Sequence, residues 1–369
     1  MLRAFSLALL GALAVAAPAS AAIGGTVTLG LVASQTGSAA AYGASQLQGA
    51  QLAVQQLTKS ELGYTLALDV KDDASTPDGA KAAFTALLGD NVTALLGPTL
   101  SGAALAADPL VQAAGRPLVA ISNTADGINA IGPYVFRASL TEREVIPAAV
   151  AVASKRFKIK RPVMITRSDQ PFAVAGAKAF GAALKKSGAP VLAEQTYTGA
   201  PASFAALLAK LAAKKPDALV INSLSEGPQL MKEARKLKAF KKVHFLGGNA
   251  FNSSAVVKDA GSAAEGLIVG AAWHPAEKSP TSRLFVSSYK RKFGKTPDQF
   301  AAQAYTGVMV TAFAIANAGS TDPAKVRAEL AATKDFDTPL GRFGFDKSRG
   351  AVVGAVVQIV RDGKFVLLS

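Results

Sequence analysis

The strongest constraint on the fold of this chain is a regular alternation of short apolar segments with amphipathic ones. Segment 26–32, TVTLGLV, has the composition of a β-strand, and segment 46–57 repeats its apolar residues at helical spacing. Thr76-Pro77-Asp78 begins another predicted helix, because threonine suits the N-cap and proline the first turn. Further strands are expected at 66–70, 94–96 and 117–121, and helices at 78–88 and 103–113. This order predicts a largely parallel sheet with helices on both faces.

A second series of the same kind follows Arg137. Its expected strands are 163–165, 191–194, 218–221 and 243–246, and its expected helices are 142–154, 174–187, 203–213 and 227–239. The final part differs, with helices around 281–293, 300–318 and 322–331, then strand-like segments at 341–345, 351–361 and 364–368. Arg361-Asp362-Gly363-Lys364 between the last two is a hairpin turn signal. A chain of 369 residues is expected to form two domains, and because no Pro/Ser-rich linker divides it, we expect several crossings between them.

The first 21 residues have the order of a secretory signal peptide. Arg3 supplies a positive charge, 5–17 is an apolar run, and Pro18-Ala19-Ser20-Ala21 offers small residues for cleavage after Ala21. The apolar run is shorter than the roughly 20 residues that span a bilayer, and no later segment has a comparable long uncharged run. The sequence therefore predicts an exported protein with no membrane insertion.

Cysteine and histidine usage narrows the compartment and the chemistry. The chain has no cysteine, which excludes disulfides and a lipid-modified N-terminal cysteine, and this favours a Gram-negative periplasm. Its two histidines, His244 and His274, are not in a metal-ligand spacing such as HExxH, and no GxSxG segment is present. We therefore expect a binding protein that is not an enzyme and has no cofactor and no metal.

The net charge of +15 raises the question of nucleic-acid binding. The basic residues are grouped in lysine-rich helical surfaces such as 155–161 and 232–238. They are not interleaved with the stacking aromatics that single-strand binders use. We therefore expect a solvated basic surface and no nucleic acid as a partner.

Short motifs follow the predicted strands in a recognisable order. They are Gln35-Thr36-Gly37, Ala41-Tyr42-Gly43, Gly49-Ala50, Asp72-Asp73-Ala74-Ser75-Thr76-Pro77, Leu96-Gly97-Pro98-Thr99-Leu100-Ser101, Ile121-Ser122, Pro133-Tyr134-Val135-Phe136-Arg137, Phe300-Ala301-Ala302-Gln303-Ala304-Tyr305 and Pro339-Leu340-Gly341-Arg342-Phe343. In this succession the sequence resembles the periplasmic solute-binding proteins of branched-chain amino acid ABC transporters, the Leu/Ile/Val-binding type. The resemblance runs from about residue 24 to the end.

The resemblance implies the type I periplasmic-binding fold, an α/β architecture of two Rossmann-like lobes with mostly parallel sheets and three interlobe crossovers. The expected crossovers lie near 138–142, 270–274 and 338–342. Lobe one is then 22–139 plus 272–338, and lobe two is 140–271 plus 339–369. The ligand is expected in the cleft, because open α/β sheets bind at the carboxyl ends of their strands. Helix N-termini at that edge favour a carboxylate or another anion.

Five residues carry the expected binding site on the strength of the resemblance. Ser101 precedes a predicted helix, where the family serine donates to the ligand carboxylate; a helix N-cap is the alternative role. Ser122 and Thr124 match the segment that contacts the ligand's α-amino and carboxylate groups, with ordinary turn chemistry as the alternative. Tyr42 and Phe172 match aromatic positions that cover the ligand from lobe one and lobe two, with core packing as the alternative.

A sixth expected site residue, Asn249, departs from the family pattern. Relatives that bind α-amino acids have a glutamate there, paired with the ligand ammonium, and a tyrosine where this chain has Asn222-Ser223-Leu224-Ser225. A neutral amide does not offset a buried ammonium charge. Asp126 and Glu226 are the candidate substitutes, and Asn249→Glu is expected to shift preference toward amino acids. The ligand is therefore open between a branched-chain amino acid and an aromatic or aliphatic acid without an amine.

The resemblance also implies a mechanism and a partner. A monomeric periplasmic binding component of an ABC transporter captures a small carboxylate-bearing solute by hinge closure and docks on a membrane permease. A ligand-sensing receptor of the same fold, coupled to a regulatory or signalling partner, is the alternative, since both functions use the same cleft.

Overall fold

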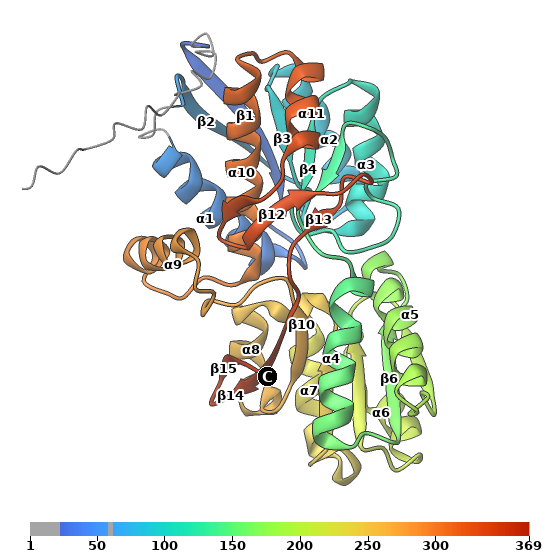
Figure 1. Ribbon diagram of the computed structural model, residues 1–369. Helices are drawn as coiled ribbons and strands as arrows, with labels where there is room; N and C mark the ends of the chain where they lie inside the picture. The colour runs from blue at the N-terminus through green and yellow to red at the C-terminus, as the bar shows by residue number, and fades with distance from the viewer. Residues whose placement is uncertain (1–22, 58–61, 369) are drawn as a thin grey trace, which may run out of the picture.

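Two α/β lobes make up residues 23–57 and 62–368, the part of the chain described by the computed structural model (Figure 1). The chain builds most of the first lobe, then the second, returns to the first and ends in the second. The predicted fold class of two lobes with mostly parallel sheets is confirmed. The predicted signal peptide, residues 1–21, lies outside the described residues.

Lobe one contains a five-stranded sheet in the order β2-β1-β3-β4-β5, with every pairing parallel. Helices α1 and α10 lie together on one face of this sheet, and α2 and α3 lie together on the other. The first-pass elements are β1 (Thr26–Ala33), α1 (Ala40–Leu57), β2 (Thr65–Asp72), α2 (Pro77–Gly89), β3 (Ala94–Leu96), α3 (Ser101–Ala113), β4 (Leu118–Ala120) and β5 (Val135–Arg137). Because both faces are covered, the central strands β3 and β4 are apolar and buried along their length.

Helices α2 and α10 of this lobe each begin directly after a residue whose side chain caps the helix N-terminus. The Thr76 side chain accepts a hydrogen bond from Gly79 N at 3.0 Å, and Pro77 stands in the first turn, as predicted. Asp298 caps α10 by accepting from Ala301 N at 3.2 Å. Strand-end loops that precede such helices place polar backbone and side chains at one edge of the sheet.

Lobe two contains a seven-stranded sheet in the order β15-β14-β10-β9-β8-β6-β7, in which the β10–β14 and β14–β15 pairings are antiparallel and the other pairings are parallel. Its elements are α4 (Glu142–Phe157), β6 (Pro162–Arg167), α5 (Pro171–Lys186), β7 (Glu194–Tyr197), α6 (Ala205–Ala212), β8 (Ala218–Asn222), α7 (Gly227–Lys236), η1 (Lys238–Phe240), β9 (His244–Gly247), η2 (Asn249–Asn252), α8 (Ser254–Ala260), η3 (Gly261–Ala264), β10 (Ile268–Ala271), β14 (Val356–Arg361) and β15 (Lys364–Leu367). Strand β7 begins at Glu194, where the predicted strand 191–194 ends. It is an edge strand with polar side chains, so its sequence carries no burial signal.

The return segment forms α9 (Pro280–Phe293), α10 (Gln299–Ala318), α11 (Pro323–Ala332) and the small antiparallel sheet β11 (Phe336–Thr338), β12 (Gly341–Phe345) and β13 (Ala351–Val352). This sheet lies against lobe one: Phe345 packs on Phe136 with ring centroids 5.1 Å apart, and Gly350 bridges Arg137. The chain enters the lobe-two sheet only at Val356. We therefore propose residues 353–355 for the third crossover, in place of the expected 338–342, with 339–352 in lobe one.

The C-terminal hairpin has the turn that its sequence predicts. Arg361 pairs with Lys364, and Asp362 and Gly363 both have positive φ, 50° and 69°. A two-residue turn needs this backbone because its twist then matches that of the strands, which is why Asp-Gly is favoured there.

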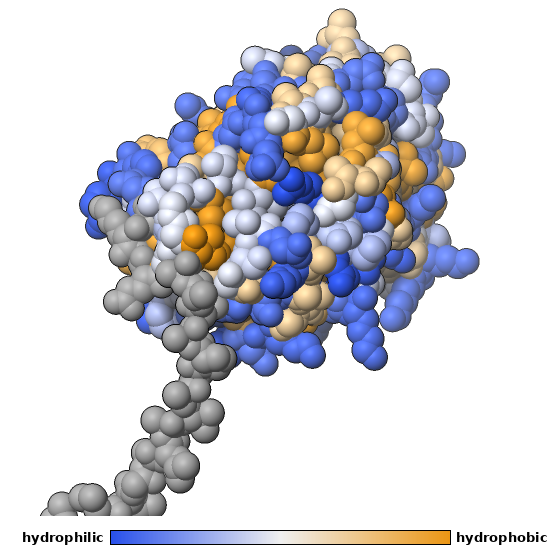
Figure 2. Space-filling model, turned by 90° about the horizontal axis from the view of Figure 1, so that it is seen from above, coloured by the Kyte–Doolittle hydropathy of each residue, from blue (hydrophilic) through white to orange (hydrophobic). Residues whose placement is uncertain are grey.

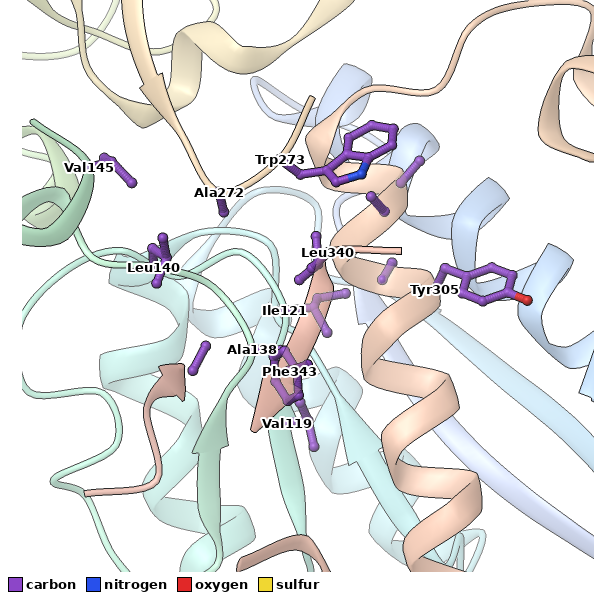
Figure 3. Packing of buried hydrophobic residues seen from close by; sticks show 14 of the residues in the cluster. Val119, Ile121, Ala138, Leu140, Val145, Ala272, Trp273, Tyr305, Leu340 and Phe343 are labelled. Atoms are coloured by element: carbon purple, nitrogen blue, oxygen red, sulfur yellow. The ribbon is translucent and has the colours of Figure 1, made fainter. Parts of the chain in front are cut away.

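The hinge contains apolar side chains from the segments that join the lobes. Leu140, Ala272 and Trp273 lie on these segments and pack with Leu340, which lies between β11 and β12; each is at most 5% exposed and belongs to one buried cluster (Figure 3). Because this cluster is continuous with residues of both lobes, the crossovers pack against one another.

Among the described residues no helix has both the length and the apolar character needed to cross a bilayer. Seen from the lobe-one end, the surface is mostly hydrophilic, with hydrophobic residues in separate small areas (Figure 2).

Candidate functional site

Residues from both lobes line one cavity at the carboxyl ends of the strands. All six residues predicted for the site line it, together with five that were not singled out. The lining residues are Tyr42, Thr99, Leu100, Ser101, Ser122, Thr124, Phe172, Leu224, Asn249, Ala250 and Phe300. The sequence motifs after β3, β4 and β9 thus converge on one place, as expected from strand order.

Ser101 is the first residue of α3 and is only 2% exposed. Its hydroxyl oxygen accepts hydrogen bonds from Thr124 N at 3.1 Å and Ala125 N at 3.3 Å. The N-cap position belongs to Leu100, so Ser101 does not have the N-cap role weighed as its alternative. Since no acceptor for the Ser101 proton occurs among the described residues' hydrogen bonds, the hydroxyl keeps a donor for a molecule in the cavity.

The Ser122 hydroxyl is occupied by the protein itself. It donates to the Thr99 carbonyl at 2.7 Å and accepts from Gln46 Nε2 at 2.7 Å. Gln46 Oε1 in turn accepts from the Thr99 hydroxyl at 2.7 Å. This closed set of bonds fixes the shape of the lobe-one wall, and Ser122 contributes to the cavity through that shape.

Thr124 directs its hydroxyl away from lobe one, to a buried carboxylate that the sequence reasoning missed. Thr124 Oγ1 donates to Glu142 Oε1 at 2.9 Å, and Asn249 N donates to Glu142 Oε2 at 3.2 Å. Glu142, the first residue of α4, is 1% exposed. Burial disfavours its charged form and raises its pKa to about 7, although the bonds from Thr124 and Asn249 act in the opposite direction.

Three aromatic side chains form the apolar part of the wall. The rings of Tyr42 and Phe300 meet edge to face, with centroids 5.0 Å apart. Phe172, near the start of α5, faces the cavity from lobe two. Within the described part of the chain the buried Tyr42 hydroxyl has no hydrogen-bond partner, and burial raises the Tyr42 pKa far above its ordinary value. The phenol is therefore a neutral group with unused donor and acceptor capacity.

Asn249 lines the cavity, but its side-chain amide forms hydrogen bonds with residues of the hinge. Its Oδ1 accepts from Gln299 Nε2 at 2.7 Å and from Asn252 Nδ2 at 2.9 Å. Its Nδ2 donates to the Leu140 carbonyl at 3.4 Å. These bonds connect residues of both lobes, so the amide stabilises the hinge where the family glutamate is said to pair with a ligand.

A family model described as periplasmic binding protein matches residues 26–364 of the chain. The chain belongs to the periplasmic binding protein family. Membership confirms the resemblance read from the motifs and the expectation of a binding protein rather than an enzyme.

Several proteins are similar to this periplasmic binding protein along most of its length. The Leu/Ile/Val-binding protein BraC3 of Rhizobium johnstonii is 28% identical over 87% of this chain and 88% of its own. The structure of the LivJ branched-chain amino acid transporter substrate-binding protein of Streptococcus pneumoniae, in complex with isoleucine, is 28% identical, with a TM-score of 0.86 over 92% of this chain and 97% of its own. A solute-binding protein of Rhodopseudomonas palustris in complex with 3,4-dihydroxy benzoic acid shares the fold, at 24% identity and a TM-score of 0.83 over 93% of this chain and 96% of its own.

The two acidic substitutes considered for the family glutamate are both ion-paired in this periplasmic binding protein. Glu226 is buried, accepts from Arg167 Nη1 at 3.0 Å and from the Tyr197 hydroxyl at 2.7 Å. Asp126 is half exposed and pairs with Arg143 at 3.0 Å. Neither carboxylate is left to face a cation in the cavity.

Two residues that sequence reasoning missed matter most for the site: Phe300, which lines the cavity, and Glu142, which lies behind Thr124. Phe300 was visible as part of a family motif, but nothing in its local sequence distinguished it from a core residue. Glu142 reads as an ordinary acidic first turn of a helix, a favourable position for any carboxylate. Only the tertiary arrangement places it beside Thr124 and Asn249.

Proposed function

We propose that this protein is the substrate-binding component of an ABC transporter and captures a small carboxylate-bearing solute by closing its two lobes. The observation that carries the proposal is the cavity itself. Tyr42, Ser101 and Phe300 face it from lobe one, while Phe172 and Leu224 face it from lobe two. A molecule held there contacts both lobes at once, so its binding energy favours the closed arrangement.

The polar end of the cavity suits a carboxylate. Ser101 offers its hydroxyl proton, and it stands in the first turn of α3, a helix of 13 residues. The unpaired N–H groups and the dipole at such an end favour negative charge. The opposite walls, formed by Phe172, Leu224 and Phe300, suit an apolar side group.

Direct contact between the lobes supports closure. A Cβ added to Gly102, on α3, would lie 3.5 Å from Cδ of Pro171, on α5. The two helices that border the cavity mouth therefore touch across the cleft. Closure of this kind excludes water and strengthens the polar contacts inside.

The relatives indicate two possible classes of carboxylate ligand, amino acids and aromatic acids. The Rhizobium and Streptococcus proteins are described as binding branched-chain amino acids, and the Rhodopseudomonas fold accommodates an aromatic acid. The cavity's mixture of aromatic walls and hydroxyl groups is compatible with both. We also propose a periplasmic, monomeric protein that delivers its ligand to a membrane permease, on the basis of the predicted signal peptide and the family.

A thermal-shift screen of residues 22–369 against amino acids, aromatic acids, aliphatic acids, amides and nucleobases tests the proposal. A ligand present at about 100 times its dissociation constant adds roughly 2.7 kcal/mol to the stability of the folded state, which is readily detected. We expect stabilisation by acids or amino acids and none by nucleobases. No shift with any class would contradict a solute-binding function.

A further inference from the structure

The hydrogen bonds around the cavity give its two adjacent hydroxyl groups opposite roles. Ser101 Oγ accepts from two backbone N–H groups, so it keeps its own proton to donate. Thr124 Oγ1 gives its proton to Glu142, so only its lone pairs are left. One hydroxyl therefore presents a donor to the cavity and its neighbour presents an acceptor.

The acceptor is backed by a buried carboxyl group without a counter-charge. Among the described residues Glu226 is paired with Arg167 and Asp126 with Arg143, but no ion pair includes Glu142. Burying an unpaired carboxylate is costly, and a cation close by relieves that cost. Glu142 therefore lacks a cationic partner, which a positive group on a ligand would supply.

A second unused acceptor lies close to Glu142. Asn222 Oδ1 is buried and has no hydrogen-bond partner among the residues that the structure describes. A Cβ added to Gly248 would lie 3.4 Å from this oxygen and 3.6 Å from Glu142 Oε2, so both oxygens border the same point. Gly248 directly precedes Asn249, which lines the cavity. Two independent features, a carboxyl group without a counter-charge and an amide oxygen without a hydrogen-bond partner, therefore favour a hydrogen-bond donor of the ligand at the end of the cavity beside Gly248.

We propose that Glu142, acting through Thr124, compensates an ammonium group on the ligand and selects an α-amino acid over the same acid without its amine. This inference rests on the proposed solute-binding function and refines its ligand class. Ser101 donates to the carboxylate, Thr124 accepts from the ammonium, and Glu142 supplies the charge that Asn249 lacks. Glu142 is a positioning residue, because its effect reaches the ligand through the Thr124 hydroxyl.

The charge state of Glu142 adds a pH signature to this selection. Burial raises its pKa to about 7 in the protein without ligand, and a nearby ammonium favours the ionised form. Arg143 and Glu144 follow it on its own helix, where Arg143 pairs with Asp126 and Glu144 accepts from Thr141 N, and Arg137 on β5 donates to the Ala125 carbonyl. The facing ends of β8 and β9 contribute the neutral residues Asn222 and Gly248. Amino-acid affinity should therefore fall about tenfold from pH 8 to pH 6.

The test is isothermal titration of residues 22–369 with matched probe pairs, each an α-amino acid and the same acid without its amine. The pairs are leucine with 4-methylpentanoate, alanine with propanoate, and phenylalanine with 3-phenylpropanoate. In the native chain we expect one amino acid to bind on the order of 100-fold more tightly than its partner, because a site built for a polar group rejects the analogue lacking it. Glu142→Gln should remove that preference and the pH slope, while leaving the affinity for the deaminated acid within about threefold.

Two further sets of variants separate selection from general structural damage. Glu144→Gln removes a carboxylate from the same helix turn but retains the capping group, and should keep the preference. Thr124→Ser, which retains the hydroxyl, should keep it as well, whereas Thr124→Val should lose it.

The outcomes that overturn the inference are distinct from those that overturn the proposed function. Deaminated acids binding as tightly as amino acids, or Glu142→Gln weakening both members of a pair equally, would overturn the role of Glu142 and leave solute binding intact. If no probe binds while the thermal-shift screen identifies another ligand class, the amine selection fails alone. If the screen is also flat, both proposals fail.

Discussion

Gln299 Nε2 donates a 2.7 Å hydrogen bond to Asn249 Oδ1 and so joins lobe one to lobe two at the hinge. Gln299 Oε1 also accepts from Ala272 N at 2.6 Å, on the second crossover, and Asn249 donates to the carbonyl of Leu140, on the first. Asn252 extends the set by donating to the Gly270 carbonyl. Asn249 is therefore a hinge residue as much as a cavity residue.

This relationship changes the expected effect of Asn249→Glu. The substitution removes the donor to Leu140 and puts a second carboxylate next to Glu142, which already accepts from the Asn249 backbone. We expect a loss of about 3 kcal/mol in the free energy of unfolding above pH 7, because an uncompensated buried charge is costly. Urea denaturation measures it, with the neutral Asn249→Gln as control. A variant of native stability with stronger amino-acid binding would support the earlier expectation instead.

Ser101→Ala should weaken ligand binding and stability together. It removes the donor to the ligand and leaves the N–H groups of Thr124 and Ala125 without their acceptor, a cost of about 1 to 3 kcal/mol. We expect affinity for the identified ligand to fall at least tenfold, an effect of about 1.4 kcal/mol, measured by titration calorimetry. Ser187→Ala is the matched control, since its hydroxyl bonds to Ala183 at the far end of α5. Unchanged affinity in Ser101→Ala would remove this hydroxyl from the site.

Arg167 pairs with the buried Glu226 and with the more exposed Asp169 in lobe two, and Tyr197 donates to the Glu226 carboxylate. Arg167→Met should cost about 3 to 5 kcal/mol, because it leaves Glu226 charged and unpaired. Adding Glu226→Gln should recover much of that loss, since the second substitution removes the stranded charge. Chemical denaturation of the native protein, the two single variants and the double variant measures the coupling between the two side chains. If the losses of stability in the single variants add up in the double variant, the pair is not coupled.

Glu142 makes stability depend on pH in a direction opposite to that of most carboxylates. Its folded pKa of about 7 lies above the ordinary value of 4.5, so its contribution is fully present below pH 4.5 and is lost as pH rises through 7. The loss amounts to about 3 kcal/mol. Relative to the native protein without ligand, Glu142→Gln should therefore gain about this much stability between pH 4 and pH 8. Parallel pH profiles for the two proteins would contradict the raised pKa.

The sequence predicted the fold and the position of the cavity because both follow from local patterns. Alternating segments specify the parallel sheets, and strand-end motifs place Ser101, Ser122 and Thr124 at one edge. It did not predict which hydroxyls are free, because the partners of Ser122 and Thr124, Gln46 and Glu142, are remote in sequence. We propose a different third crossover from the one expected from sequence because Phe345 of β12 packs on Phe136, a long-range contact with no local signal.

The central claim, capture by closure of two lobes, is tested most directly by a distance measured across the cleft. The chain has no cysteine, so Leu110→Cys on α3 and Lys178→Cys on α5, both exposed, can carry one spin label each. Pulsed electron paramagnetic resonance then gives the distance distribution with and without a ligand found in the thermal-shift screen. The account predicts a broad distribution without ligand that becomes narrower and shorter with it. Saturating ligand that leaves the distribution unchanged would contradict capture by closure.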